Sequence, residues 1–290
     1  MDYGGLWADV TSRWLSPTRI ALPSIEHISV IDEVLCMSNY LSRFSHSHSS
    51  NVHYRFTMFD ENSPPILNHI RHLAVLDLMS QVSSLIGGPL AYLVFADNVS
   101  NDGPCRKLEL DANVAPISDD PSALPVMTLI FDCISGDDAH LSCFQVILDG
   151  LGGQLTHVEK MMLLDMDPYM AIDWSRPLAR LRNLRDLTLS ADDPNPIVEL
   201  MGSVMAEHRN ERTGITKREV YLQALEHLKF SLLGRDEELF ELVARSLSRR
   251  MGLGSRLPVL TMHMVDDPLQ PHDERLLSQV VSSLVSENET

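Results

Sequence analysis

Three histidines close together are the first residues in this sequence that could do chemistry. His46, His48 and His53 lie within one short stretch, and imidazole nitrogens are common ligands of catalytic zinc. A catalytic zinc site also needs its ligands held at fixed angles by regular structure. These histidines lie in a serine-rich stretch, and the next carboxylate along the chain is Asp60. We therefore interpret them as residues of a solvated loop and predict no metal site.

Three copies of the tripeptide Asp-Asp-Pro bring carboxylates together. They occur at Asp119–Pro121, Asp192–Pro194 and Asp266–Pro268. A calcium-binding loop needs oxygen ligands at a fixed spacing that ends in a glutamate, and none of the three copies has that spacing. Aspartate is a favoured helix N-cap and proline a favoured turn residue, so we interpret the copies as turns. The sequence also contains no Gly-x-Ser-x-Gly elbow, P-loop or His-Glu-x-x-His motif. We therefore predict no catalytic residues and no cofactor.

The pattern that does recur is structural. Residues 184–189 read Leu-Arg-Asp-Leu-Thr-Leu, with leucine at positions 1, 4 and 6, a spacing typical of the strand in a leucine-rich repeat. On a strand, positions 4 and 6 point to one face of the sheet and positions 3 and 5 to the other. Apolar residues with this spacing begin at Ile25, Ile70, Leu90, Cys105, Val126, Val158, Leu184, Leu225 and Leu257.

Segments with helical spacing separate most of these predicted strands. The spacing predicts helices over residues 76–86, 139–151, 196–211, 236–252 and 273–285. We therefore predict an α/β leucine-rich-repeat solenoid, in which a curved parallel sheet carries its helices on the convex side. Residues 1–24 form a leader that caps one end, residues 25–268 form the solenoid, and residues 269–290 form a C-terminal capping helix. The interval between copies varies from 15 to 45 residues, so an ordinary α/β domain with a parallel sheet is the alternative.

In such a solenoid, positions 3 and 5 of each hexapeptide line the concave face. These positions hold His27, Ser29, His72, Tyr92, Lys107, Glu109, Thr128, Lys160, Met162, Asp186, Thr188, His227, Lys229 and Thr261. Aromatic and cationic side chains are frequent anchors in protein interfaces. The predicted protein-binding residues are Tyr92, Lys107, Lys160, Asp186, His227 and Lys229. The alternative is that these are solvated strand positions with no dedicated partner.

Longer phrases of the sequence resemble a known group of proteins. Leu181–Leu189, Leu225–Phe230 and the run from Glu238 to Met262 resemble the repeats of fungal F-box/leucine-rich-repeat proteins. In that family an N-terminal F-box docks the adaptor of a ubiquitin ligase, and the repeats hold the substrate. The resemblance implies a module for substrate recognition through protein–protein contacts. Residues 1–24 are too few for an F-box of about three helices, so we expect this chain alone not to bind the ligase adaptor.

Composition narrows the classes of partner. The formal net charge is −17 and the pI is about 5.0, which argues against a nucleic-acid backbone or an anionic membrane surface as the partner. Four cysteines without a Cys-x-x-Cys pair, no apolar run of about 20 residues and no signal-peptide profile predict a cytoplasmic or nuclear protein. We therefore expect a protein partner. Two alternatives are an α/β enzyme whose active site the sequence does not reveal, and a structural scaffold.

Overall fold

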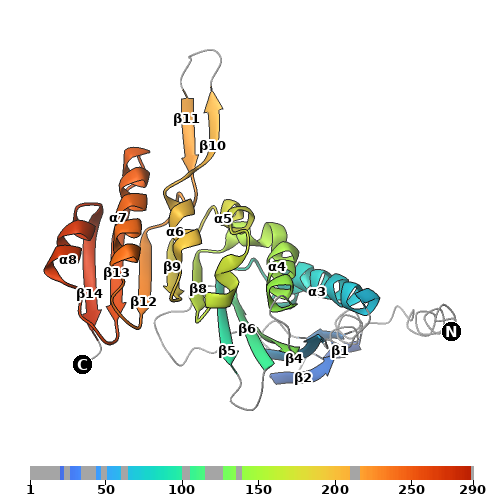
Figure 1. The fold of residues 1–290 in the computed structure, drawn as a ribbon. Helices are drawn as coiled ribbons and strands as arrows, with labels where there is room; N and C mark the ends of the chain where they lie inside the picture. Colours follow the sequence, from blue (N-terminus) through green and yellow to red (C-terminus); the bar gives the residue numbers. More distant parts are fainter. Residues whose placement is uncertain are drawn as a thin grey trace.

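A large, mostly parallel sheet with helices packed against it forms the body of the chain (Figure 1). The computed structural model describes residues 20–22, 27–33, 44–46, 51–59, 65–99, 105–114, 127–134, 139–209 and 216–288. Within these ranges the strand order of the large sheet is β14-β13-β12-β9-β8-β5-β6-β7-β4-β2. The coarse prediction of an α/β fold with a parallel sheet is therefore confirmed.

The strands of this sheet cover both halves of the chain. In chain order they are β2 (His27–Glu33), β4 (Asn51–Phe59), β5 (Tyr92–Val99), β6 (Cys105–Asn113), β7 (Met127–Ile134), β8 (Lys160–Leu164), β9 (Asp186–Ser190), β12 (His227–Leu232), β13 (Leu257–Met264) and β14 (Val281–Asn288). Two smaller pairs stand apart: β1 (Ile20–Leu22) with β3 (Phe44–His46), and the hairpin of β10 (Val204–Arg209) and β11 (Thr216–Val220). The hairpin projects from the body beyond α6 (Figure 1).

Helices lie along one face of the sheet. They are α3 (Pro65–Leu85), α4 (Ala139–Leu151), α5 (Ser175–Arg180), α6 (Asn195–Met201), α7 (Glu237–Gly252) and α8 (Pro271–Ser278), with short 3-10 turns η1 (Gly152–His157) and η2 (Asp167–Ala171). Helix α7 shows how local sequence sets an element. The Asp236 carboxylate caps its first turn by accepting from the Leu239 amide at 3.1 Å, and Arg249 and Arg250 lie in its last turn. Both arrangements suit the helix dipole.

Alternate residues of each strand divide the sheet into a covered face and an open one. Leu187 and Leu189 of β9 and Leu228 and Phe230 of β12 are fully buried and belong to one continuous core with the helices. Their neighbours along the strand, such as Thr188, are only half-buried. We call the half-buried side the open face; in the C-terminal strands it comprises Lys160, Met162, Asp186, Thr188, His227, Lys229 and their cross-strand neighbours. Parallel sheets usually have both faces covered, whereas the helices within the described residues cover one face of this sheet.

The second half of the chain is built by one repeated step. From β8 through β9, β12, β13 and β14, each strand lies beside the next strand of this sheet and runs parallel to it, with a helix in between. The β10–β11 hairpin is inserted between β9 and β12. The first half departs from this order. Strand β6 runs antiparallel between β5 and β7, so the predicted sheet of parallel strands alone is wrong there. A hairpin explains the difference, because antiparallel neighbours need only a short connection.

One predicted strand is a helix. The apolar spacing at Ile70, Leu73 and Val75 lies inside α3, and Leu73 is 51% exposed although position 4 of the pattern should be buried. The buried residues of this segment instead follow helical spacing, with Val75, Leu78 and Val82 all covered. The apolar spacing of this segment fits a helix as well as a strand, because residues three apart lie on the same side of a helix. His72, predicted on the concave face, therefore lies on α3.

Two predicted helices are shorter than expected. The helix over 196–211 ends at Met201, and β10 begins at Val204. Gly202 follows the helix and packs against the backbone of Ser246 in α7, where an added Cβ would lie 2.8 Å from the Cα atom. The predicted C-terminal helix over 273–285 ends at Ser278, and the following residues form β14, the last strand of the sheet. Of the predicted leader, residues 1–24, only β1 lies within the described residues.

Candidate functional site

Four of the six predicted binding residues form one row across the open face. Strand register places Tyr92 of β5 beside Lys160 of β8, Lys160 beside Asp186 of β9, and Asp186 beside His227 of β12. Lys229 lies two residues further along β12, in the next row. Because neighbouring strands are about 4.8 Å apart, the row spans roughly 15 Å and is made of side chains from distant parts of the sequence.

Tyr92 is more covered than predicted. This residue is only 8% exposed, and the Lys160 ammonium lies over its ring at 5.7 Å from the centroid. Its hydroxyl donates to the sulfur of Met162 at 3.1 Å. Burial, and next the charge of Asp111, raise the pKa of the Tyr92 phenol. A cation over an aromatic face is attracted by the ring, so Tyr92 and Lys160 form one preorganised unit. Tyr92 was predicted at an exposed strand position, and its burial shows that this exposure is wrong.

His227 links three strands. Its Nδ1 lies 3.6 Å from Oδ1 of Asp186, and its Nε2 lies 2.8 Å from the hydroxyl of Thr261 in β13. Carboxylate, imidazole and hydroxyl follow one another as in a catalytic triad. The residue that carries this hydroxyl, Thr261, is only 3% exposed. The chain of contacts holds the imidazole in place. Thr261 itself was predicted to be exposed, and that prediction is wrong.

Lys229 is engaged by a residue that the sequence did not suggest. Its ammonium lies 2.7 Å from a carboxylate oxygen of Glu287 in β14. The hydrogen bond from Lys229 lowers the pKa of Glu287. We missed Glu287 because its segment was predicted to be helical. A signal was present, since Val281 and Leu284 fit positions 1 and 4 of the repeated hexapeptide and only Ser286 breaks position 6.

Lys107 lies away from the row. The register of β6 against β5 places it opposite Asn98, toward the far end of β5 from Tyr92. Between these two ends, β6 presents Glu109 and Asp111 on the same face. Burial raises the pKa of both carboxyls; for Glu109 the charge of Asp111 adds to the rise. The structure therefore brings five of the six predicted residues into two adjacent rows and separates the sixth.

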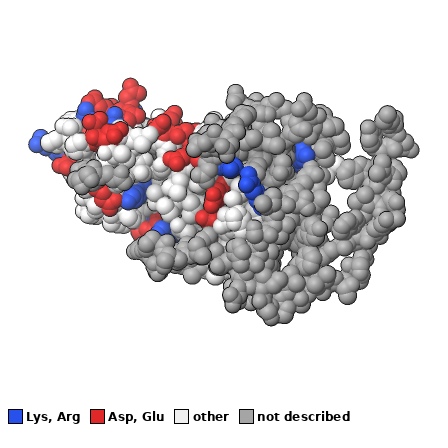
Figure 2. Space-filling view, turned by 90° about the horizontal axis from the view of Figure 1, so that it is seen from below, with Lys and Arg blue, Asp and Glu red and all other residues white. Residues whose placement is uncertain are grey.

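Carboxylates gather along one edge of the sheet, at the carboxyl ends of its C-terminal strands. We call the following exposed residues the acidic rim: Asp165, Asp167, Asp192, Asp193, Asp236, Glu237, Glu238, Asp266 and Asp267. The Arg235 guanidinium lies beside the rim and forms ion pairs with the carboxylates of Glu237, at 2.6 Å, and Asp273, at 3.0 Å. Figure 2 shows the molecule from this edge, with acidic side chains concentrated toward the C-terminal strands. The rim adjoins the open face, because the rim residues follow the ends of β8, β9, β12 and β13, which carry that face.

Part of the rim also shapes its own turns. Asp167 accepts hydrogen bonds from the backbone amides of Asp192 and Asp193, and Asp193 accepts one from the Asn195 amide at 3.3 Å. This supports the interpretation of Asp192–Pro194 as turn chemistry. Asp119–Pro121 lies outside the described residues. Asp266 lies in the loop after β13 and Glu238 in the first turn of α7, and both are exposed.

The predicted solvated histidines fall partly outside the described side chains. His53 lies on β4 beside Thr128 of β7, whereas nothing is described for the side chains of His46 and His48. Among the described residues, no three histidine, cysteine, aspartate or glutamate side chains come close enough to hold a metal ion. Within the same ranges, no helix is both long enough and apolar enough to cross a bilayer.

Comparisons with protein-family models, with curated proteins and with solved structures find no match to this chain.

Proposed function

We propose that this chain is a non-enzymatic protein-binding module whose binding surface is the open face and the adjoining acidic rim. The observation that carries the proposal is the mostly parallel sheet, of which the described residues cover only one face. A polar face of this kind needs no helix over it and leaves room for a partner. The row from Tyr92 to His227 is held in place by its own contacts, and preorganised side chains lose less entropy on binding.

The finer fold that we propose for residues 160–288 is an irregular leucine-rich-repeat solenoid. Supporting it are the sequential parallel order from β8 to β14, the helix in each step, and hexapeptides whose positions 1, 4 and 6 are buried, as at Leu184, Leu187 and Leu189. Small-angle scattering tests this proposal. A curved, open particle supports it, and a near-spherical particle would contradict it.

The chemistry of the surface favours a basic protein partner. The acidic rim carries exposed carboxylates along one edge, and the whole chain is negative, at −17. Cations on the open face are already matched within the chain, as Lys229 is by Glu287 and Lys160 is by the Tyr92 ring. Charge complementarity steers association and disfavours wrong partners. The resemblance to F-box/leucine-rich-repeat proteins supports a more specific form of the proposal, in which the partner is a substrate of a ubiquitin ligase.

Paired charge reversals test the surface. The rim variant Asp266→Lys/Asp267→Lys changes exposed side chains that make no hydrogen bond within the described residues. The control variant Glu199→Lys/Glu241→Lys makes the same change of charge on the exposed sides of α6 and α7. Affinity capture from lysate, quantified by mass spectrometry at low and moderate salt, compares the two with the unmodified chain. Proteins lost by the rim variant and kept by the control support the proposal.

A third variant separates the open face from the rim. Thr188→Arg places a long side chain in the middle of the open face while leaving the buried neighbours Leu187 and Leu189 unchanged. We expect it to remove the same partners as the rim variant. Thermal melting of each variant shows that the fold is intact. Capture of one unchanged set of proteins by all variants would place the binding surface elsewhere.

A further inference from the structure

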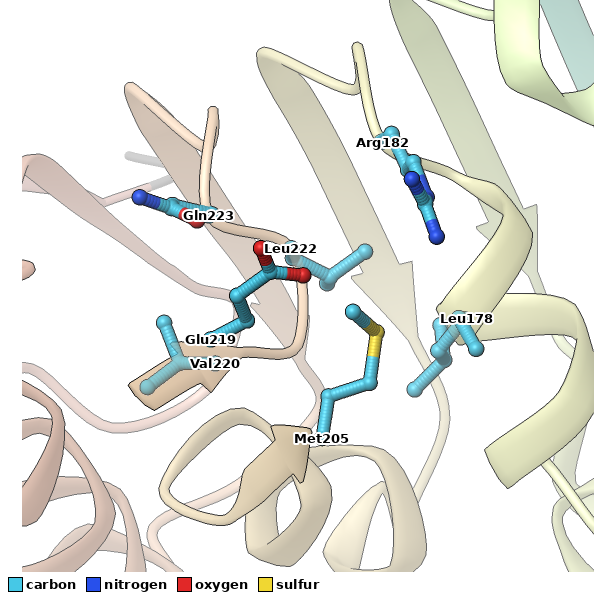
Figure 3. A pocket seen from close by; sticks show the side chains of 8 residues that line it. Leu178, Arg182, Met205, Glu219, Val220, Leu222 and Gln223 are labelled. Atoms are coloured by element: carbon cyan, nitrogen blue, oxygen red, sulfur yellow. The ribbon is translucent and has the colours of Figure 1, made fainter. Parts of the chain in front are cut away.

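A small pocket opens on the helical side of the sheet, at the base of the β10–β11 hairpin (Figure 3). Its volume is about 160 Å³. It is lined by Leu178, Ala179, Arg182, Met205, Glu219, Val220, Leu222 and Gln223. The residues come from the α5 segment on one side and from the hairpin and the turn that follows it on the other. The pocket therefore lies between the body of the sheet and the β10–β11 hairpin that projects from it.

The side chains divide the pocket into an apolar floor and two polar walls. Figure 3 shows Leu178, Met205 and Leu222 on the floor, with the Arg182 guanidinium directed into the space on one side and the Glu219 carboxylate facing it from the other. Within the described residues, no hydrogen bond or ion pair engages the Arg182 side chain. With no ion pair or hydrogen bond from the described residues, the Arg182 guanidinium is available to bind an anion at this pocket. The Glu219 carboxylate on the other wall lies 4.0 Å from Nε2 of His208.

One wall of this pocket contains two energetically unfavourable features, a strained backbone at Leu222 and a buried cation at Arg250. Leu222 has φ of 52°, in the left-handed region that is unfavourable for a residue other than glycine. Arg250 of α7 is 0% exposed and donates to the carbonyl oxygens of Tyr221 and Leu222, both at 2.6 Å. Burial lowers the pKa of Arg250 to about 10. A buried cation bound only to carbonyls costs free energy. Such costs concentrate at functional sites, and here both support the same pocket.

The size of the pocket limits its ligand. A cavity of about 150 Å³ holds a benzene-sized group, whereas pockets for cofactors and drug-sized molecules start at about 300 Å³. One aliphatic side chain fits this volume, and a nucleotide does not. The walls offer a cation for a carboxylate and, at Glu219 and Gln223, acceptors for an N–H group. The ligand that satisfies all three is an aliphatic α-amino carboxylate.

We propose that this pocket binds the carboxylate of a leucine-like residue, either as a free amino acid or as the C-terminal residue of a peptide. The carboxylate pairs with Arg182, since guanidinium and carboxylate match in a two-pronged geometry. The aliphatic side chain rests on Leu178, Met205 and Leu222, and the nitrogen of the ligand faces Glu219. This site is independent of the open face, because it lies on the opposite side of the sheet.

Calorimetric titration of the purified chain tests the proposal with four probes: leucine, N-acetyl-leucine, leucinamide and the peptide Gly-Gly-Gly-Leu with a free carboxylate. We expect at least one carboxylate probe to bind, with a dissociation constant on the order of 1 mM, and leucinamide not to bind. If leucine binds and N-acetyl-leucine does not, the ligand is a free amino acid. Binding of the peptide and N-acetyl-leucine identifies a peptide end.

Two variants and a matched control locate the binding. Arg182→Gln should lower the affinity for the carboxylate probe by about tenfold or more. Ala179→Leu should abolish binding by filling the pocket. Arg176→Gln removes an exposed arginine of the nearby helix α5 that does not line the pocket, and it should leave binding unchanged. No saturable binding of any carboxylate probe at about 10 mM, or binding that is unaffected by Arg182→Gln or Ala179→Leu, would overturn the proposal.

Discussion

Replacing Leu228 with alanine tests which face of the sheet is covered. Leu228 is 0% exposed in the middle of β12, and its neighbours in register, Leu187 of β9 and Leu260 of β13, are also buried. The truncation removes about 2 kcal/mol of transfer free energy. The close surroundings leave a cavity that cannot fully collapse, which brings the expected loss to about 3–4 kcal/mol.

The adjacent residue supplies the internal control for this measurement. Lys229 lies on the open face, and its ion pair with Glu287 is part-exposed, at 33% and 46% for the two side chains. An exposed pair of this kind contributes roughly 0–1 kcal/mol, so Lys229→Ala should change stability little. Urea unfolding followed by circular dichroism gives the free energy and the m-value for both variants. Equal losses, or a larger loss at Lys229, would show that the assignment of the two faces is wrong and would remove the basis of the proposed binding surface.

Three further predictions concern single contacts. Gly202→Ala should destabilise the chain by about 1–3 kcal/mol, measured by urea unfolding, because its Cβ would meet the Ser246 backbone at 2.8 Å; an unchanged midpoint would mean that α6 and α7 separate without cost. Asp236→Ala should cost about 1 kcal/mol in thermal unfolding, because it removes the cap on the Leu239 amide, whereas Asp236→Asn should largely preserve it. Asp111→Asn should raise stability at pH 7. Burial raises the folded-state pKa of Asp111 above its unfolded value, so stability falls as pH rises through that window. The gain should disappear as pH approaches about 3.9, and a gain that persists there would contradict this cause.

Local periodicity predicted much of the fold. The hexapeptides at Leu184, Leu225 and Leu257 are strands whose positions 1, 4 and 6 are buried, because alternation on a strand is set by backbone geometry alone. Helix α7 was also predicted, since its cap, charges and stop signals lie within its own sequence. The open-face positions of Lys160 and Asp186 follow from the same alternation.

Tertiary structure decided the rest, because it depends on segments that are distant in the chain. The apolar spacing in residues 70–75 suits a strand and a helix equally, and packing of α3 against α4 selected the helix. Lys229 meets Glu287 only because β14 joins the sheet beside β13. Likewise, Arg182 and Glu219 face one pocket only because the base of the hairpin lies beside the α5 segment. Periodicity reports which side of an element is buried. It carries no information on which other element supplies the neighbours, and those neighbours set the coverage of Tyr92, the contacts of His227 and the pocket at Arg182.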